Sequence, residues 1–180
     1  NYTDILADTY YFEKNKDFEY LYNKMLKFKK NYFNKFSKNK FFDNYSEKDA
    51  IIIGSLIEKE GTDYYDKRMI SSVIFNRLNI NMKLQIDATV LFAITNGNYV
   101  LNRKLNLNDL KIDNSYNTYK YKGLTPSPIS YVGTKTIDII MENYKSDYLF
   151  YFYNDILKKH IFSKNFNEHK KKLNEFRNQK

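Results

Sequence analysis

The sequence predicts an α+β domain in which helices dominate, and three observations lead to this expectation. Apolar residues recur at steps of three and four over much of the chain, which is the spacing of an amphipathic helix. Two runs near the C-terminus, 147–155 and 160–163, are rich in Tyr and Phe, as the strands of a β-hairpin are. The length of 180 residues suits a single domain, 1–180, with a hydrophobic core of its own.

The N-terminal third is expected to hold two helices joined by a surface segment. Apolar residues on one face predict a first helix over 17–35, and the polar, Lys-rich segment 34–45 reads as a connection on the surface. Ser46 and Asp49 have the spacing of a capping box and open a second helix, which Gly61 is well placed to stop.

The remaining elements are helices and one ordered loop. Helical spacing is expected in the following segments: 66–78, 89–94, 134–143 and the Lys-rich tail from Asn167. A single helical turn is expected at 106–110. Both prolines of the chain fall within 116–132, which we therefore expect to be an ordered loop.

The composition describes a folded, basic chain. Thirty Lys and Arg against 21 Asp and Glu give a net charge of +9, which favours an anionic partner. An aromatic content of 18% is typical of packed proteins, because disordered chains are poor in aromatic residues. The absence of Cys excludes disulfides, thiolate nucleophiles and Cys-based metal sites, and two His residues exclude a His-rich one.

Targeting signals and membrane spans are absent from the sequence as given. No apolar run approaches the roughly 18 residues that cross a bilayer, and no signal peptide opens the chain. Because the first residue is Asn1 rather than Met, we expect the chain to be a segment of a longer protein, whose anchor lies elsewhere.

The end of the second helix carries the sharpest functional feature. At about 100° per residue from Ala50, the apolar residues fill a sector of roughly 200–340°, and Glu60 falls near 280°, inside it. Glu58 falls near 80°, at the margin. Burial and the negative end of the helix dipole both raise a carboxyl pKa, as a general acid requires. From periodicity alone, a frayed helix end with a solvated Glu60 is the alternative.

Ordered blocks of sequence resemble the YceG-like family of endolytic murein transglycosylases over nearly the whole chain. The blocks are 54–60 (GSLIEKE), 73–78 (VIFNRL), 82–89 (MKLQIDAT), 115–119 (SYNTY), 123–129 (GLTPSPI) and 160–163 (HIFS). The chain departs from the family pattern at Ala88 and Thr125, where proline is common, and these departures concern loop shape. The resemblance implies a mostly helical, lysozyme-like catalytic domain with a small C-terminal hairpin.

The resemblance also implies an activity and a setting. Such enzymes cleave the bond between N-acetylmuramic acid (MurNAc) and N-acetylglucosamine within peptidoglycan strands, leaving 1,6-anhydroMurNAc ends. The catalytic region normally follows a LysM-like domain and a single helix in the inner membrane, and faces the periplasm and cell wall. Neither segment lies in this chain. Cell-wall synthases are the expected protein partners.

The resemblance and the helical wheel both favour Glu60, which is followed by Gly61, as the single catalytic acid and base. The nucleophile is then the C6 hydroxyl of MurNAc, so that no metal or cofactor is required. Glu58 becomes a substrate-binding group at the edge of the cleft, or a surface residue. If water attacked instead, the enzyme would be a lysozyme-like muramidase, with Asp87 or Glu58 as the base.

The expected substrate-binding residues lie on two loops. Gln85 offers an amide donor and acceptor to sugar groups, and Tyr116, Asn117 and Thr118 combine aromatic and polar character. The alternatives are a polar loop residue for Gln85 and self-bonded turn residues for Asn117 and Thr118. Asp87 reads as a helix-capping residue. Structural roles are favoured for the remaining polar residues of the blocks: Asn76, Arg77, His160 and His169.

Nucleic-acid binding is the rival that the composition suggests. Basic and aromatic residues interleave at 27–30 and 35–38, as they do in single-strand binders. Acidic residues are spread throughout, however, and no nucleic-acid motif occurs, so a solvated basic face is favoured and no nucleic-acid partner is expected. A wall-binding module without activity is a second rival, and the retained Glu60 speaks against it.

Overall fold

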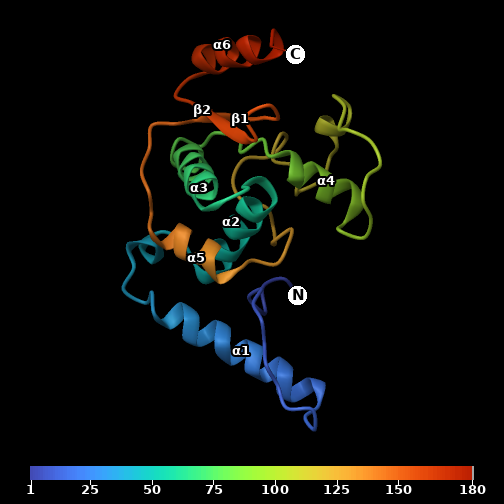
Figure 1. Ribbon diagram of the computed structural model, residues 1–180, viewed down its shortest axis with the longest axis vertical. Helices are drawn as coiled ribbons and strands as arrows, with labels where there is room; N and C mark the ends of the chain where they lie inside the picture. The colour runs from blue at the N-terminus through green and yellow to red at the C-terminus, as the bar shows by residue number, and fades with distance from the viewer. Residues whose placement is uncertain (180) are drawn as a thin grey trace.

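The computed structural model describes residues 1–179, which form six α-helices, two short 3-10 helices and a two-stranded antiparallel sheet (Figure 1). In chain order the elements are α1 (Phe18–Asn34), η1 (Lys40–Asp43), α2 (Glu47–Glu60), α3 (Tyr64–Asn79), α4 (Asp87–Thr95), η2 (Asp109–Lys111), α5 (Thr134–Met141), β1 (Phe150–Asn154), β2 (Lys159–Ser163) and α6 (Phe166–Arg177). The expected α+β class with dominant helices is confirmed.

Helix α2 lies in the middle of the molecule, with α3, α4 and α5 around it (Figure 1). Its N-terminus carries the expected capping box, in which Ser46 and Asp49 bond each other's backbone amides. Every residue from Ala50 to Ile57 is buried, because the helix has neighbours on all sides at this point. The last turn of α2 extends beyond this buried region, and Glu60 is its final residue.

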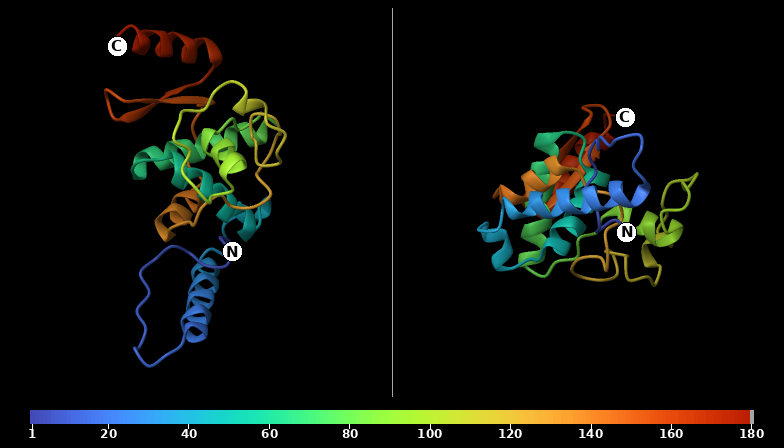
Figure 2. Two further views of the ribbon diagram at one scale, coloured as in Figure 1. Left: turned by 90° about the vertical axis from the view of Figure 1, so that its right-hand side faces the viewer. Right: turned by 90° about the horizontal axis from the view of Figure 1, so that it is seen from below.

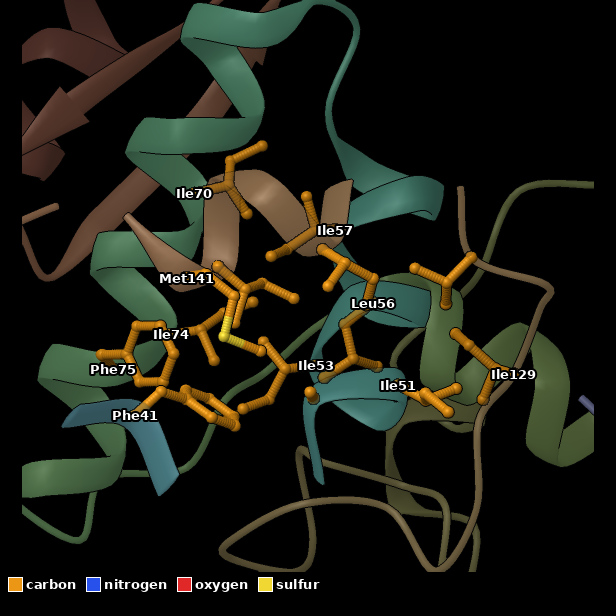
Figure 3. Close-up of a cluster of buried hydrophobic side chains, with 14 of the residues drawn as sticks. Phe41, Ile51, Ile53, Leu56, Ile57, Ile70, Ile74, Phe75, Ile129 and Met141 are labelled. Carbon is orange, nitrogen blue, oxygen red and sulfur yellow. The ribbon is translucent and has the colours of Figure 1, made fainter. Parts of the chain in front are cut away.

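The hydrophobic core fills the space between α2, α3 and α5 (Figure 3). Ile53 and Ile57 of α2 lie within the same buried cluster as Ile70 and Ile74 of α3. Phe41 of η1 joins this cluster and is 4% exposed. The segment 34–45 is a largely exposed connection, as expected, but its short helical turn also places the Phe41 ring in the core.

The β-hairpin and α6 form a layer at one end of the molecule, and α1 lies at the opposite end (Figure 2). Strand β1 pairs with β2 in a register that runs from Phe150 opposite Ser163 to Asn154 opposite Lys159. Helix α6 packs on the hairpin, and its Phe176 ring lies 5.6 Å from that of Phe152. The hairpin thus sits between α6 and the end of the helical core.

Side chains of α3 tie the hairpin to the helical core. The amide of Asn76 donates to the carbonyls of Ser146 and Tyr148, on the segment that enters β1. Arg77 donates to the carbonyl of Leu149. Both residues therefore serve structural contacts that cross between elements far apart in the sequence. Within residues 1–179, no helix has the length and apolarity required to traverse a bilayer.

Candidate active site

Glu60, the last residue of α2, lines a cavity of about 290 Å³ beneath the hairpin. The cavity draws its walls from α2, α3, the start of α4, two loops and both strands. Its other lining residues are Arg77, Leu84, Gln85, Asp87, Tyr119, Tyr151, Phe152, Tyr153 and His160. The cavity therefore gathers two carboxyl groups, a guanidinium, an imidazole, an amide and several aromatic rings.

The Glu60 carboxyl group is held in a largely dry environment. The hydroxyl of Tyr151 donates to Oε2 of Glu60 at 3.2 Å. Burial raises the pKa of Glu60 above its ordinary value, and the negative charge of Asp87 raises it further. The Tyr151 bond, the charge of His160 and the amide of Ala88 act in the opposite direction but do not reverse the shift. The alternative of a frayed helix end is thereby removed.

Arg77 is a buried cation that bonds backbone rather than a carboxylate. It is 7% exposed, and its Nε donates to Leu149 O at 2.6 Å while Nη1 donates to Leu84 O at 2.5 Å. Burial lowers the pKa of its guanidinium. Within residues 1–179, Arg77 forms no ion pair with a carboxylate. Arg77 instead joins the start of the hairpin to the loop that carries Gln85.

His160 connects the hairpin to α3 through a buried hydrogen bond. Its Nδ1 lies 2.8 Å from Oδ2 of Asp66, and both side chains are almost fully enclosed. Burial opposes ionisation of Asp66, yet the bonds from His160 and Thr62 hold the pKa of this carboxyl below its ordinary value. The His160 ring packs edge-on against Tyr151 at 5.2 Å. Asp66 and His160 thus fix the tyrosine that contacts Glu60.

Gln85 lines the same cavity as Glu60, as expected from the sequence. Its backbone is left-handed, with φ of 52°, a conformation that non-glycine residues adopt at a cost and that is enriched at functional sites. The amide N–H of Gln85 donates to Thr118 O at 3.1 Å, which holds the turn in place.

Asp87 is the first residue of α4 and also faces the cavity. The prediction that it caps this helix was wrong, because no side chain bonds the N-terminal amides of α4. Its Oδ1 instead accepts a hydrogen bond from the hydroxyl of Tyr119 at 2.5 Å. A second carboxylate therefore stands in the cavity beside Glu60.

The expected site loop contributes Tyr119 rather than Tyr116, Asn117 or Thr118, none of which lines the cavity. The Tyr116 hydroxyl bonds that of Ser127. Asn117 is fully buried and donates to two backbone carbonyls of the preceding loop. The hydroxyl of Thr118 accepts from the amide of the residue after Gln85. These side chains bond other protein groups beneath the site rather than facing the cavity. The self-bonded turn is observed for Asn117, whose Oδ1 accepts from Tyr119 N, but not for Thr118, whose hydroxyl bonds residues at the start of α4.

Glu58 points away from the cavity, to the start of α5. Its Oε2 lies 2.5 Å from Nζ of Lys67, and its Oε1 accepts from Gly133 N at 3.0 Å and from Thr136 Oγ1 at 2.6 Å. Burial acts against ionisation, but these donors together lower the pKa of Glu58. The expected place at the edge of the Glu60 cavity is not observed, because the carboxylate is bound to α3 and α5.

Tyr119, Tyr151, Arg77 and His160 are among the cavity residues to which sequence reasoning gave no site role. Arg77, Tyr119 and His160 lie within blocks that resemble the family, and this position was the available signal, whereas Tyr151 lies outside them. Their neighbours in space come from distant parts of the chain, however. Tyr151 meets Glu60 across 91 residues, a contact that no local pattern encodes.

Two further features bear on the choice of site. In the described part of the chain, no three His, Asp or Glu side chains are grouped to hold a metal ion. A larger hollow of about 430 Å³ lies beside α4, between Lys59 and an exposed loop that includes Tyr99 and Val100. No carboxylate lines this hollow. Of these two hollows, the smaller one therefore holds the carboxyl groups that acid–base chemistry requires.

Comparison with known proteins gives consistent matches. A profile of the YceG-like family matches residues 3–175. An endolytic murein transglycosylase of Bacillus subtilis strain 168 is 40% identical over 121 residues, which cover 67% of this chain and 32% of that protein. One of Streptococcus pneumoniae strain D39 is 34% identical over 141 residues, which cover 76% of this chain and 25% of that protein.

A solved structure supports the same likeness. The crystal structure of a yceG-like protein from Listeria monocytogenes matches with a TM-score of 0.79 at 35% identity. The match covers 93% of this chain and 54% of that chain. The present chain therefore spans between about a quarter and about half of the length of these relatives.

Proposed function

Because the chain belongs to the YceG-like family, we propose that it is the catalytic domain of an endolytic peptidoglycan lytic transglycosylase, a lyase acting on a polysaccharide. The observation that carries the proposal is Glu60, a carboxyl group with a raised pKa in a cavity rich in hydrogen-bonding groups. The names of the two curated relatives and the likeness of the fold agree with it.

The proposed reaction needs one acid and no cofactor. Glu60, protonated in the resting enzyme, gives its proton to the oxygen between MurNAc and N-acetylglucosamine as the bond from that oxygen to C1 breaks. The C6 hydroxyl of the same MurNAc then bonds to C1, and its proton passes to the Glu60 carboxylate. The products are a 1,6-anhydroMurNAc end and a free N-acetylglucosamine hydroxyl, and the acid is restored.

The cavity walls suit a sugar ring in this reaction. The exposed amide of Gln85 provides a donor and an acceptor for hydroxyl or N-acetyl groups. Tyr151 holds the Glu60 carboxyl group, and the buried pair of Asp66 and His160 holds Tyr151. Such fixed positions matter, because orienting the reacting groups lowers the barrier before any proton moves.

A lysozyme-like muramidase is the second candidate, and Asp87 is the specific observation in its favour. A hydrolase uses a second carboxylate as base or nucleophile, and Asp87 shares the cavity with Glu60. In that case water or the carboxylate attacks C1, and the cleaved strands end in reducing MurNAc. The two candidates therefore differ in a product that can be measured directly.

The cellular setting is a proposal from the family resemblance. In it, the full-length protein has a single-pass anchor in the bacterial inner membrane and acts on the cell wall near its synthases. A net charge of +9 is compatible with peptidoglycan, whose peptides carry many carboxylates. No nucleic-acid partner is proposed.

Mass spectrometry of the products from purified peptidoglycan tests the proposed reaction. The chain should release strands that end in 1,6-anhydroMurNAc, each lighter by one water than the matching reducing strand. Reducing ends as the main product would replace the transglycosylase with the muramidase. An absence of cleavage at any enzyme concentration, with a family relative active in parallel, would remove both candidates.

A further inference from the structure

Asp87 occupies a place in the cavity that its structural environment does not explain. It begins α4, yet its carboxylate does not cap the helix. Across residues 1–179, no Lys, Arg or His forms an ion pair with it. Its observed side-chain partner is the Tyr119 hydroxyl, which fixes Oδ1 at 2.5 Å. An unpaired, oriented carboxylate thus faces the same space as Glu60.

The two carboxyl groups of the cavity experience opposite conditions. Glu60 stands at the C-terminus of α2, largely enclosed and bonded by Tyr151, where a negative charge is disfavoured. Asp87 stands at the N-terminus of the nine-residue α4 and is exposed to the cavity, where a negative charge is favoured. Two carboxyl groups placed in such different surroundings can take different roles in one reaction.

Tyr119 is suited to hold the Asp87 carboxylate. Its ring lines the cavity, and burial together with the charge of Asp87 raises the pKa of its hydroxyl, so that the phenol remains a donor. A bond to one carboxylate oxygen orients the group and leaves the other oxygen available to a ligand in the cavity. The arrangement is prepared before substrate binds, which is the condition for electrostatic stabilisation of a transition state.

We propose that Asp87 is a second catalytic residue, whose carboxylate contacts the sugar ring at the cleaved bond and stabilises the positive charge that develops at C1. This role rests on the proposed function. Asp87 neither donates nor accepts a proton: the proton leaves Glu60 for the glycosidic oxygen, and the C6 hydroxyl proton returns to Glu60. The same negative charge raises the pKa of Glu60 and helps to keep it protonated.

The test compares Asp87→Asn with the parent in steady-state cleavage of uncross-linked glycan strands. Asparagine keeps the shape and can accept from Tyr119, but it lacks the charge. We expect kcat to fall on the order of 10²-fold, as for loss of one transition-state contact, with KM nearly unchanged. The basic limb of the kcat–pH profile should move to lower pH, because Glu60 loses the charge that raises its pKa.

Asp113→Asn is the matched control. Asp113 also accepts a hydrogen bond from a tyrosine, Tyr121, but lies on the surface away from the cavity, with a side chain that is 72% exposed. This variant should retain the kcat and pH profile of the parent. Tyr119→Phe, which keeps the charge but frees the carboxylate, should lower kcat less than Asp87→Asn does and leave the basic limb in place.

The proposal is overturned if folded Asp87→Asn has a kcat within threefold of the Asp113→Asn control, or if its basic limb does not move. Activity of the parent and its loss in Glu60→Gln report separately on the proposed function. An active parent with an inactive Glu60→Gln and a normal Asp87→Asn would remove the role of Asp87 alone. An inactive parent would remove the proposed function itself.

Discussion

Glu58 and Glu60 stand two residues apart on α2, and their carboxyl groups meet opposite surroundings. Three donors surround Glu58 and lower its pKa, whereas burial and a neighbouring negative charge raise the pKa of Glu60. A step of two residues turns a side chain by about 200° around a helix, so the two groups face different neighbours. At the scale of the residue, this rotation around the helix places Glu58 in a structural ion pair and Glu60 in the position of a candidate acid.

Glu60→Gln should stabilise the fold in a pH-dependent manner. The raised pKa means that the parent is most stable, relative to the variant, below the ordinary value of 4.5, and loses this advantage as pH rises through the folded pKa. The difference in melting temperature, variant minus parent, should therefore grow from about pH 4 towards pH 7. Thermal melts in matched buffers measure it, and a difference that shrinks with rising pH would contradict the assigned environment.

Glu58→Gln should destabilise the fold at neutral pH. The lowered pKa of Glu58 contributes stability above the ordinary value of 4.5, and this contribution is lost as pH falls through the folded pKa. Removing the charge leaves Lys67 without its carboxylate partner and weakens two further bonds, at a cost of roughly 1–3 kcal/mol at pH 7. Urea unfolding at pH 7 and pH 4 measures the effect, with the exposed Glu175→Gln as control. An equal cost at both pH values would contradict this explanation.

At the scale of the element, the close approach of α2 to the loop before α5 fixes where Glu60 emerges. A Cβ atom on Gly54 would lie 2.6 Å from Cγ1 of Val132, a side chain that is fully buried. The helix can therefore pack at this depth only with glycine at position 54. The same packing brings Glu58 to Gly133 at the start of α5.

Gly54→Ala should consequently destabilise the protein, although alanine is the better helix former. Helix propensity alone would add about 1 kcal/mol of stability. Overpacking of a closed core costs typically 1–3 kcal/mol, and valine, branched at Cβ, has little freedom to move aside. The free energy of unfolding in urea decides between the two terms, and Gly54→Ala with Val132→Ala should recover part of the loss. A more stable single variant would show that the helix shifts without cost.

At the scale of the whole molecule, the helices and the position of Glu60 could be predicted from the sequence, because both depend on local periodicity and capping. The capping box at Ser46 and the apolar sector of α2 are complete within a few turns of chain. The cavity depends instead on long-range contacts. Tyr151 and His160 reach Glu60 and Asp66 only when the hairpin folds over α3, and this geometry left no periodic trace in the sequence.

The loop residues show the same limit of prediction from sequence. Gln85 was found because its amide chemistry and its block in the family pattern pointed to it. Asn117 and Thr118 belong to an equally promising block, yet their side chains satisfy buried backbone groups. Residue type alone does not distinguish a polar group that faces a cavity from one that supports its wall, because both carry the same donors and acceptors.

The most direct test of the central claim, that Glu60 is the acid, compares Glu60→Gln and Glu58→Gln in release of anhydro products from peptidoglycan. Both variants are assayed below their melting temperatures, so that the expected loss of stability in Glu58→Gln does not enter the rate. Glu60→Gln should lose about 10²–10⁴-fold in activity, because it cannot transfer a proton, and should still bind intact strands. Glu58→Gln should stay within about tenfold of the parent, below the usual range for a lost acid. A folded but inactive Glu58→Gln beside an active Glu60→Gln would contradict the assignment of the acid.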